Sequence, residues 1–418
     1  MLAEIITIGD ELLIGQVIDT NSAWMARELN KTGIMVHQRV AVGDVWDDIW
    51  NALNAAAEQS PIILITGGLG PTADDITKPL LCAYFGGKLV MHEPTLAHVT
   101  YLFEQVFKRP GPLLERNRKQ AEVPDVCTVL KNERGTAPGM LFEKNGRIFI
   151  SLPGVPHEMQ GLMHDHVLPL LQERFRLQHV GHRTLLTAGT GESVIAEMLK
   201  DFEPNLPAFM KLAYLPAYGM VRLRLTATGE RSMVEHALDT QFATLQQIVK
   251  DQLVTNEDIP MQEVVGKLLK GKGATMATAE SCTGGNIAHL ITTVPGASAW
   301  FSGSVVSYDN SIKQRVLGVQ QSILSTDGAV SEATVTEMAW GVLHLMQTDY
   351  AVAVSGIMGP DGGTPEKPVG MVWMAAANSS IVKTKLIHLR FDRQRNIDIT
   401  SVQALNFLRQ FIVEHSTG

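Results

Sequence analysis

The chain has 418 residues, of which 45% are hydrophobic and 19% charged, and its formal net charge is −8 at neutral pH. This length exceeds what a single hydrophobic core supports, so we expect two or three domains. The acidic balance argues against direct nucleic-acid binding, no apolar run is long enough to cross a bilayer, and the first residues lack a basic leader, so the sequence predicts a cytoplasmic protein without membrane partners.

The N-terminal elements alternate between strands and helices. Apolar runs and amphipathic patterns predict, in chain order, strand 3–9, helix 21–33, helix 48–59 and strand 61–68. Asn21 or Ser22 is the expected start of the first helix, since short polar residues favour that position. The alternation over residues 1–172 is typical of an α/β layered domain.

Residues 173–254 have a different pattern. The expected elements are strand 182–189, helix 192–202 and strand 220–229. In the last of these, Val221, Leu223 and Leu225 alternate with polar residues, as in an antiparallel strand with one solvated face. We therefore expect a small α+β connector.

The α/β alternation returns over residues 255–418. The expected elements are helix 262–273, strand 274–279, helix 286–294, strand 300–308, helix 331–346, strands 350–356 and 370–377, and helix 399–415. The scattered cysteines Cys82, Cys127 and Cys282 predict neither a disulfide framework nor a zinc finger. The predicted fold class is therefore α/β, with two α/β layered domains joined by the α+β connector.

The loop "TGGLGPTADDITK" (66–78) combines glycines and acids after a predicted strand. Glycines allow close approach of main-chain amides to a phosphate, and paired carboxylates tolerate that phosphate when a hard divalent cation lies between them. The alternative is that an aspartate only caps the next helix. Candidate metal ligands are Asp10, Asp74 and Asp75, with Glu11 as a further acid, and candidate substrate contacts are Gly67, Gly68, Gly70 and Thr72.

Five N-terminal motifs occur in a fixed order: "GDELLIGQVIDTN", "TGGLGPTADDIT", "NRKQA", "GTAPGM" and "LPGVPHEM". Together they resemble the N-terminal domain of the competence/damage-inducible CinA family, which is similar to molybdopterin-binding domains of the MoaB/MogA type. The resemblance implies a metal-dependent pyrophosphatase that cleaves ADP-ribose to AMP and ribose 5-phosphate. Oxygen ligands suit several divalent ions, so Mg, Mn, Co and Ni remain open.

The stretch "MATAESCTGG" (276–285) places three candidate nucleophiles, Ser281, Cys282 and Thr283, between a predicted strand and a helix. The alternative is that Ser281 or Thr283 only caps the helix. The motif lacks a GxSxG elbow and a histidine, which leaves a lysine such as Lys313 as the candidate base. Such a base needs its pKa lowered from about 10.4 toward ~7 by burial or nearby cations, and the alternative is that Lys313 is a surface lysine of a helix.

The motifs "AESCTGG", "GSVVSYDNSIKQRVLGV", "GAVS" and "SGIMGPDGGTPEKPVGMVW" resemble the C-terminal domain of the same family, which is similar to PncC-type nicotinamide mononucleotide (NMN) deamidases. The resemblance implies hydrolysis of NMN to nicotinate mononucleotide and ammonia without a cofactor, with Ser281 as nucleophile, Lys313 as base and Tyr308 assisting. Cys282 is then a bystander. The expected substrate contacts are Glu280, Thr283, Gly284, Gly285, Asn310, Gly359, Gly362 and Gly363.

Three positions depart from the family pattern: Ser304 replaces a usual glycine, and Met358 and Met371 replace smaller residues.

The resemblance also implies a KH-like connector, a homodimer and the small-molecule partners NMN and ADP-ribose. The connector shows no GxxG nucleic-acid clamp, so RNA binding is not expected. Two alternatives stay open: an N-terminal half that handles molybdopterin, and a non-catalytic accessory protein of DNA uptake or repair.

Overall fold

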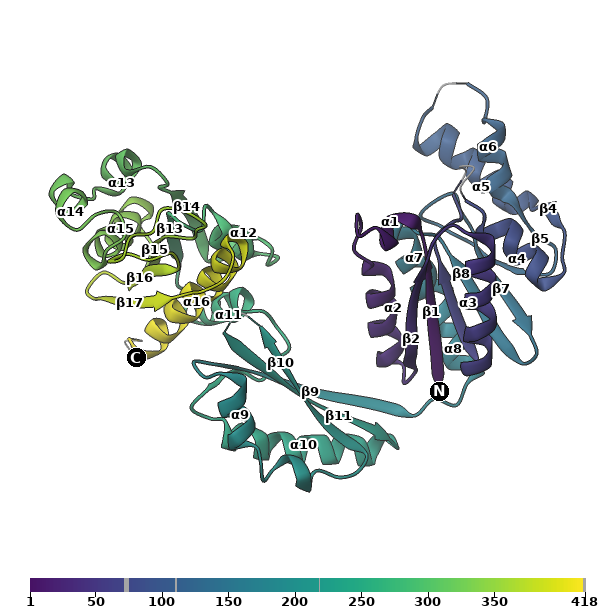
Figure 1. The fold of residues 1–418 in the computed structure, drawn as a ribbon, viewed down its shortest axis with the longest axis horizontal. Helices are drawn as coiled ribbons and strands as arrows, with labels where there is room; N and C mark the ends of the chain where they lie inside the picture. The colour runs from purple at the N-terminus through teal and green to yellow at the C-terminus, as the bar shows by residue number, and fades with distance from the viewer. Residues whose placement is uncertain (71–74, 110, 218, 416–418) are drawn as a thin grey trace. The chain divides into compact units, whose positions relative to one another are not determined.

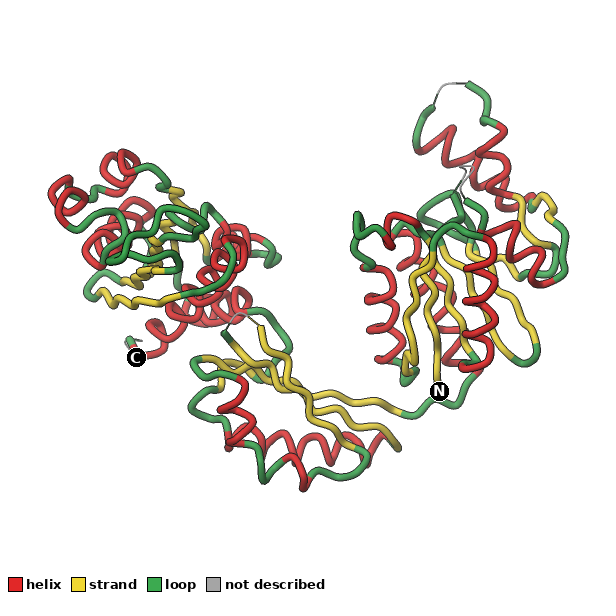
Figure 2. Tube along the Cα trace, viewed as in Figure 1, coloured by secondary structure: helices red, strands yellow, loops and turns green. Residues whose placement is uncertain are grey.

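The structure is a computed structural model that describes residues 1–70, 75–109, 111–217 and 219–415. Its main sheets have six, four and five strands and follow one another along the chain (Figures 1 and 2). Contacts divide the chain into two compact units, Met1–Gly181 with Thr226–Leu238, and His182–Leu225 with Asp239–Gly418. Within the described ranges, no helix combines the length and the apolar character needed to cross a membrane.

The N-terminal sheet has the strand order β2-β1-β3-β8-β7-β6. Strand β1 pairs in parallel with β2 and β3, β3 pairs in parallel with β8, and β7 runs antiparallel to β8. The strands are β1 (Leu2–Ile8), β2 (Met35–Val42), β3 (Ile62–Thr66), β6 (Thr128–Leu130), β7 (Gly139–Lys144) and β8 (Arg147–Leu152). The carboxyl ends of four parallel strands therefore lie along one edge.

Helices cover both faces of this sheet. Alternate residues of β3 point to opposite faces, so Ile62 and Leu64 pack with α2 (Thr20–Lys31), α7 (Pro156–Leu162) and α8 (Leu168–Arg174), whereas Ile63 and Ile65 pack with α3 (Trp46–Gln59) and α4 (Thr77–Phe85). The remaining elements are α1 (Asp10–Leu13), β4 (Leu89–Met91), α5 (Glu93–Tyr101), α6 (Glu115–Arg118) and β5 (Glu122–Pro124), of which β4 and β5 form a separate two-stranded sheet.

The predicted start of α2 at Asn21 or Ser22 is wrong. The helix begins at Thr20, one residue before Asn21, because Asp19 is its N-cap and accepts a hydrogen bond of 2.9 Å from the Ser22 amide. An aspartate satisfies a free amide of the first turn as well as the residues that we favoured.

The middle part is a four-stranded sheet with the order β10-β11-β9-β12. Its elements are β9 (His179–Ala188), α9 (Glu192–Met198), β10 (Met210–Ala217), β11 (Met220–Gly229), α10 (Arg231–Ile248) and β12 (Leu253–Thr255). Val221, Leu223 and Leu225 are buried, as their alternation predicted, whereas β10 and the long helix α10 were not expected.

The C-terminal sheet has the order β14-β13-β15-β16-β17, in which β13 pairs in parallel with β14 and β15, and β16 and β17 continue antiparallel. The strands are β13 (Met276–Glu280), β14 (Phe301–Val306), β15 (Tyr350–Gly356), β16 (Met371–Ala377) and β17 (Val382–His388). The antiparallel edge strand β17 was not predicted, but the α/β fold class with an α+β connector is confirmed.

The two faces of the C-terminal sheet differ in side-chain size. Val352 and Val354 of β15 face a core with α11 (Met261–Lys272), α12 (Asn286–Thr292) and α16 (Arg393–Glu414), whereas Ala351 and Ala353 face α15 (Glu332–Met346). Small residues on that face let α15 lie close to the strands. The remaining helices are α13 (Asn310–Leu317) and α14 (Gln321–Thr326).

Gly341 of α15 is predicted to be essential for the packing of α15 against the end of α13. A Cβ atom there would lie 2.0 Å from the Leu317 carbonyl oxygen, so Gly341→Ala should lower the free energy of unfolding by about 1–3 kcal/mol. Gly271 of α11 is the matched control, since a Cβ atom there meets nothing within 4 Å, and Gly271→Ala should instead stabilise the helix by about 0.5–1 kcal/mol. Calorimetric melting of the full chain compares the two variants; equal shifts would contradict the prediction.

Candidate functional site

The C-terminal part contains a cavity of about 270 Å³ beyond the carboxyl ends of β13, β14 and β15. It brings together six of the predicted site residues, which are Ser281, Tyr308, Asn310, Lys313, Gly359 and Gly362. They come from the loops that follow the three parallel strands and from the first turns of α13. Residues more than 70 positions apart in the chain therefore share one cavity.

Lys313 is buried, although its position on α13 allowed a surface lysine. Its Nζ donates hydrogen bonds to the main-chain oxygens of Ser307 (2.7 Å) and Tyr308 (3.3 Å). Burial lowers the pKa of Lys313 from its ordinary value of 10.5, and the nearby Cys282 and Asp309 oppose this shift. The amine is therefore easier to deprotonate than a solvated lysine.

Cys282 also lines the cavity, but its thiol is a weak acid. Burial raises its pKa to about 12, and the charge of Glu280 acts in the same direction. Cys282 is therefore a neutral thiol at physiological pH. Because the thiolate is the reactive form of cysteine, this neutral thiol is a poor nucleophile. The adjacent Ser281 hydroxyl does not need to be ionised beforehand, because a neighbouring base can accept its proton during the attack.

The fully buried carboxylate of Glu280 holds the loop that presents Ser281. It accepts hydrogen bonds from the Thr283 hydroxyl (2.7 Å) and from the amides of Gly285 (3.1 Å), Ile287 (3.0 Å) and Ala288 (2.8 Å). Glu280 thereby caps α12, in place of the serine or threonine considered as an alternative.

Several of the predicted substrate contacts lie outside the lining of this cavity. Glu280, Thr283, Gly284 and Gly285 do not line the cavity, and the Gly285 amide is already bonded to Glu280. Gly363 does not line it either, and a Cβ atom at this position would lie 2.8 Å from the main-chain nitrogen of Val369. The side chain of Glu280 thus positions the loop, whereas the sequence suggested a substrate contact.

Arg393, at the start of α16, is a cavity residue that sequence reasoning missed. Its guanidinium donates to the Gly359 carbonyl (2.7 Å) and to the Tyr308 hydroxyl (3.0 Å). It therefore links the glycine loop to the tyrosine and brings positive charge to the cavity. The sequence predicted that this last helix begins at residue 399, whereas α16 begins at Arg393. Asp392 in "DRQRN" is its N-cap, and an aspartate at that place was the available signal for the earlier start.

The three departures from the family pattern have different positions. The Ser304 hydroxyl donates to Glu280 (3.3 Å), so it adds to the loop-holding network. Met358 is buried and lines the cavity, where it narrows the space for a ligand. Met371 lies at the start of β16 and does not line it.

At the N-terminal sheet edge, Asp10 and Asp44 form a reciprocal pair. The Asp10 amide donates to the Asp44 carboxylate (3.2 Å), and the Asp44 amide donates to the Asp10 carboxylate (3.1 Å). Burial raises the pKa of Asp44, and the charges of Asp10, Glu11 and Asp75 raise it further against one main-chain hydrogen bond. Asp44 was missed because it follows β2, a strand that the sequence did not predict.

The glycine loop lies beside this pair. Asp75 accepts a hydrogen bond of 2.8 Å from the Gly70 amide, and a Cβ atom at Gly68 would lie 2.0 Å from the Thr77 hydroxyl and 3.5 Å from Asp44 Oδ1. In the described part of the chain, the buried Thr77 hydroxyl has no hydrogen-bond partner. The predicted residues Thr72 and Asp74 lie outside the described residues.

This edge fits a hard divalent cation. Its donors are carboxylate oxygens that repel one another, and an unpartnered hydroxyl lies next to them. Within the described residues, no group of three or more acids, histidines or cysteines is placed so that it could hold a metal ion. Magnesium commonly takes one or two carboxylates and completes its shell with water and substrate phosphates.

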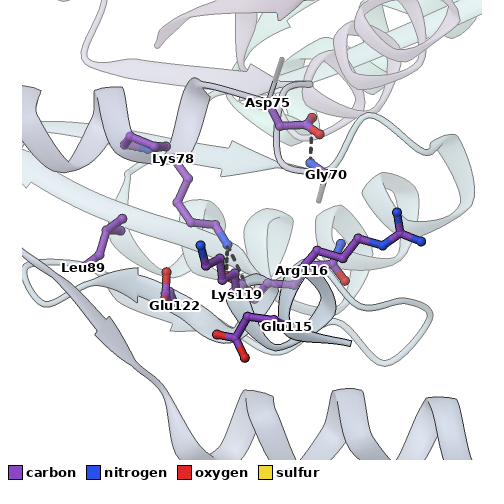
Figure 3. A pocket seen from close by; sticks show the side chains of 10 residues that line it. Gly70, Asp75, Lys78, Leu89, Glu115, Arg116, Lys119 and Glu122 are labelled. Carbon is purple, nitrogen blue, oxygen red and sulfur yellow. Dashed lines mark hydrogen bonds between the residues drawn. The ribbon is translucent and has the colours of Figure 1, made fainter. Parts of the chain in front are cut away.

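A cavity of about 500 Å³ opens on one side of the loop (Figure 3). Asp75 and Gly70 line it together with charged residues of α4, α6 and the segment after α6, namely Lys78, Glu115, Arg116, Lys119 and Glu122. Lys78 is buried and donates to the Gln120 carbonyl (3.0 Å). Burial lowers its pKa to about 8, although Glu122 and Asp75 oppose the shift.

A smaller cleft of about 130 Å³ lies against Gly67. Its lining is mixed: the apolar residues are Ile8, Leu12, Val17, Ile18 and Pro156, and the polar residues are Thr7, Glu11, Asp19, Thr20, Asn21 and Thr66. Of the predicted glycines, Gly67 lines this cleft, Gly70 lines the charged cavity, and Gly68 lines neither.

Comparison with known proteins gives three family matches along the chain. Residues 4–173 match the model "Probable molybdopterin binding domain", residues 182–255 match "Damage-inducible protein CinA KH domain", and residues 258–412 match "CinA C-terminal domain".

Two relatives are similar to this chain over nearly its whole length. A CinA-like protein of Cytophaga hutchinsonii is 46% identical over 99% of this chain and 98% of its own length, and one of Flavobacterium psychrophilum is 44% identical over 99% of both chains. Among solved structures, the competence damage-inducible protein A of Klebsiella pneumoniae is 33% identical over 38% of this chain and 100% of its own, with a TM-score of 0.37.

Proposed function

The chain belongs to the CinA family, and from this membership we propose that it is a cytoplasmic hydrolase with two activities. The proposed domains are residues 1–172, an ADP-ribose pyrophosphatase, residues 173–254, a KH-like connector, and residues 255–418, an NMN deamidase. The observation that carries the proposal is the convergence of Ser281, Tyr308 and Lys313 on one cavity. The proposed cofactor is a divalent metal in the N-terminal domain only, and the proposed assembly is a homodimer.

In the deamidase, the Ser281 hydroxyl oxygen attacks the carboxamide carbon of NMN and Lys313 accepts its proton. Lys313 returns a proton to the nitrogen as the C–N bond breaks, so ammonia leaves and an acyl ester remains on Ser281. Water then hydrolyses the ester, which releases nicotinate mononucleotide and restores the serine. Arg393 orients the Tyr308 hydroxyl at the cavity and supplies positive charge for a phosphate.

In the pyrophosphatase, water attacks one phosphorus of ADP-ribose, and the bond from that phosphorus to the bridging oxygen breaks. The bridging oxygen leaves with the other phosphate, giving AMP and ribose 5-phosphate. Asp10, Asp44 and Asp75, with Asp74 beyond the described residues, are the proposed metal ligands. A cation bound there would screen the phosphate charges.

Molybdopterin handling is the second candidate for the N-terminal domain, because the family model that matches residues 4–173 is described as molybdopterin-binding. Measuring ADP-ribose cleavage and molybdopterin binding on the full chain separates the two. Binding without cleavage would favour the second candidate.

Ser281→Ala should lower ammonia release from NMN by roughly 10³-fold or more, since it removes the proposed nucleophile and the neighbouring Cys282 is a neutral thiol. Cys282→Ala is the neighbouring control and should retain activity within a few-fold. The assay measures ammonia from the full chain without added metal. A dead cysteine variant beside an active serine variant would reverse the assignment.

The pH dependence of deamidation should follow Lys313. The neutral amine is the proton acceptor, so kcat/KM should rise with pH through the pKa of Lys313, and burial sets that inflection below 10.5. Asp309 raises this pKa, so Asp309→Asn should move the inflection to lower pH while still capping α13. An inflection that stays in place in Asp309→Asn, or lies at or above 10.5 in the wild type, would exclude Lys313 as the base.

Asp44→Asn and Asp75→Asn should each reduce ADP-ribose cleavage at least about tenfold, because each removes a proposed ligand charge. Deamidation should not change, since it occurs in another domain. Asp47→Asn, an exposed acid in the first turn of α3, is the matched control. AMP formation is measured with and without a chelator, and undiminished wild-type cleavage under full chelation would contradict the metal role.

A further inference from the structure

The N-terminal sheet has a further cavity, of about 390 Å³, at the end where its parallel strands begin. It is lined by residues from the last turns of α3, from the end of α4, and from β8 and the turn that joins β7 to β8, namely Asn54, Ala57, Glu58, Tyr84, Lys144, Asn145, Arg147 and Phe149. Figure 1 shows this turn at the same end of the sheet as the chain's N-terminus. None of these residues lines the cavities at the opposite end, and the five residues of β3 separate the two ends by roughly 16 Å.

Two cations face each other in this cavity. Lys144 and Arg147 are directly paired residues of β7 and β8, and paired side chains lie on the same face of a hairpin, where like charges repel. Lys144 Nζ donates to the Tyr84 carbonyl (2.8 Å) and has no carboxylate partner. In the part of the chain that the structure describes, Arg147 makes neither a hydrogen bond nor an ion pair. The protein therefore leaves this repulsion uncompensated, and an anion between the two cations would relieve it.

An aromatic wall holds the two cations in place before any ligand arrives. Lys144 Nζ lies 4.1 Å from the centroid of the Tyr84 ring, and the Tyr84 hydroxyl donates to Asn54 Oδ1 (3.0 Å). Burial raises the pKa of Tyr84, and the charge of Arg147 lowers it, so Arg147 lies near the phenol. Cations that are fixed in this way lose little conformational freedom when an anion binds, which favours affinity.

The remaining groups of the cavity favour sugar hydroxyls over a nucleobase or a second phosphate. The carboxylate of Glu58 accepts hydrogen bonds from hydroxyls but repels an extended polyanion, and the side-chain amides of Asn54 and Asn145 add further donors. Tyr84 and Phe149 are only 7% and 1% exposed, so neither offers a ring face on which a base could stack. The matching ligand is small and carries one phosphate and several hydroxyls.

We propose that this cavity binds a monophosphorylated sugar, with the phosphate between Lys144 and Arg147 and the sugar hydroxyls toward Glu58. The site does not depend on the proposed hydrolysis, because it lies at the opposite end of the sheet from the proposed metal ligands. Helix α4 is shared by the two ends: Lys78, near its start, lines the cavity at the carboxyl ends of the strands, and Tyr84, near its end, lines this one. A sugar phosphate bound here thus contacts a helix that also borders the proposed active site.

The test is calorimetric titration of the full chain with glucose 6-phosphate, which is neither a substrate nor a product of the proposed reactions. We expect saturable binding of glucose 6-phosphate, weaker binding of inorganic phosphate and no binding of glucose. Arg147→Ala and Lys144→Ala should each weaken glucose 6-phosphate at least about tenfold, because each removes a charge-assisted contact to the phosphate. Arg147→Lys keeps the charge and should lose less affinity than Arg147→Ala.

Two arginines outside this cavity are the matched controls. Arg116 lines the cavity at the other end of the sheet, and Arg176 is exposed and lines neither, so Arg116→Ala and Arg176→Ala should each change the affinity less than about twofold. Loss of binding in Arg116→Ala but not in Arg147→Ala would place the ligand at the other cavity and overturn the proposal. Wild-type protein that does not bind glucose 6-phosphate, or binds glucose or inorganic phosphate equally well, would overturn it too. Melting curves check that the weakened variants remain folded.

Discussion

The C-terminal site depends on the buried carboxylate of Glu280. A charge removed from water at the end of β13 is tolerated only if its oxygens are fully hydrogen-bonded, and four donors from residues 283–288 meet that need. The same bonds fix the turn between strand and helix, so Ser281 has one defined position at the cavity. The Ser304 hydroxyl joins this network, which explains how a serine is accommodated where the family pattern has glycine.

Both outer parts of the chain use the same property of parallel sheets. In the N-terminal part the loops after β1, β2 and β3 carry Asp10, Asp44 and Gly67–Gly70, and in the C-terminal part the loops after β13, β14 and β15 carry Ser281, Tyr308 and Gly359. Because parallel strands end at the same edge, residues distant in sequence meet there without any long connecting loop. The different chemistry of the two edges comes only from the side chains of those loops.

Much of this was predictable because the site residues directly follow apolar strands. That rule drew attention to the segment with Ser281, whereas the roles of Ser281 and Tyr308 came from the family resemblance. The rule failed for Asp44, because its strand β2 is mostly solvated and carries no continuous apolar run. Adjacency to a strand end also does not tell which way a side chain points, and the carboxylate of Glu280 bonds to its own loop. Arg393 was missed because its place at the cavity depends on how α16 packs on the sheet, which local pattern does not encode.

Each outer part also buries a lysine whose Nζ is held by two consecutive main-chain carbonyls, at Lys119 and Gln120 for Lys78 and at Ser307 and Tyr308 for Lys313. For Lys78, Glu122 and Asp75 stabilise the cation, and with a pKa of about 8 it is mostly protonated at neutral pH. Lys313 has Cys282 and Asp309 as its opposing groups. Since the pKa of Cys282 is about 12, the thiol carries no charge at neutral pH, so only Asp309 opposes burial there. A neutral cysteine beside the serine thus favours the free amine that the serine needs.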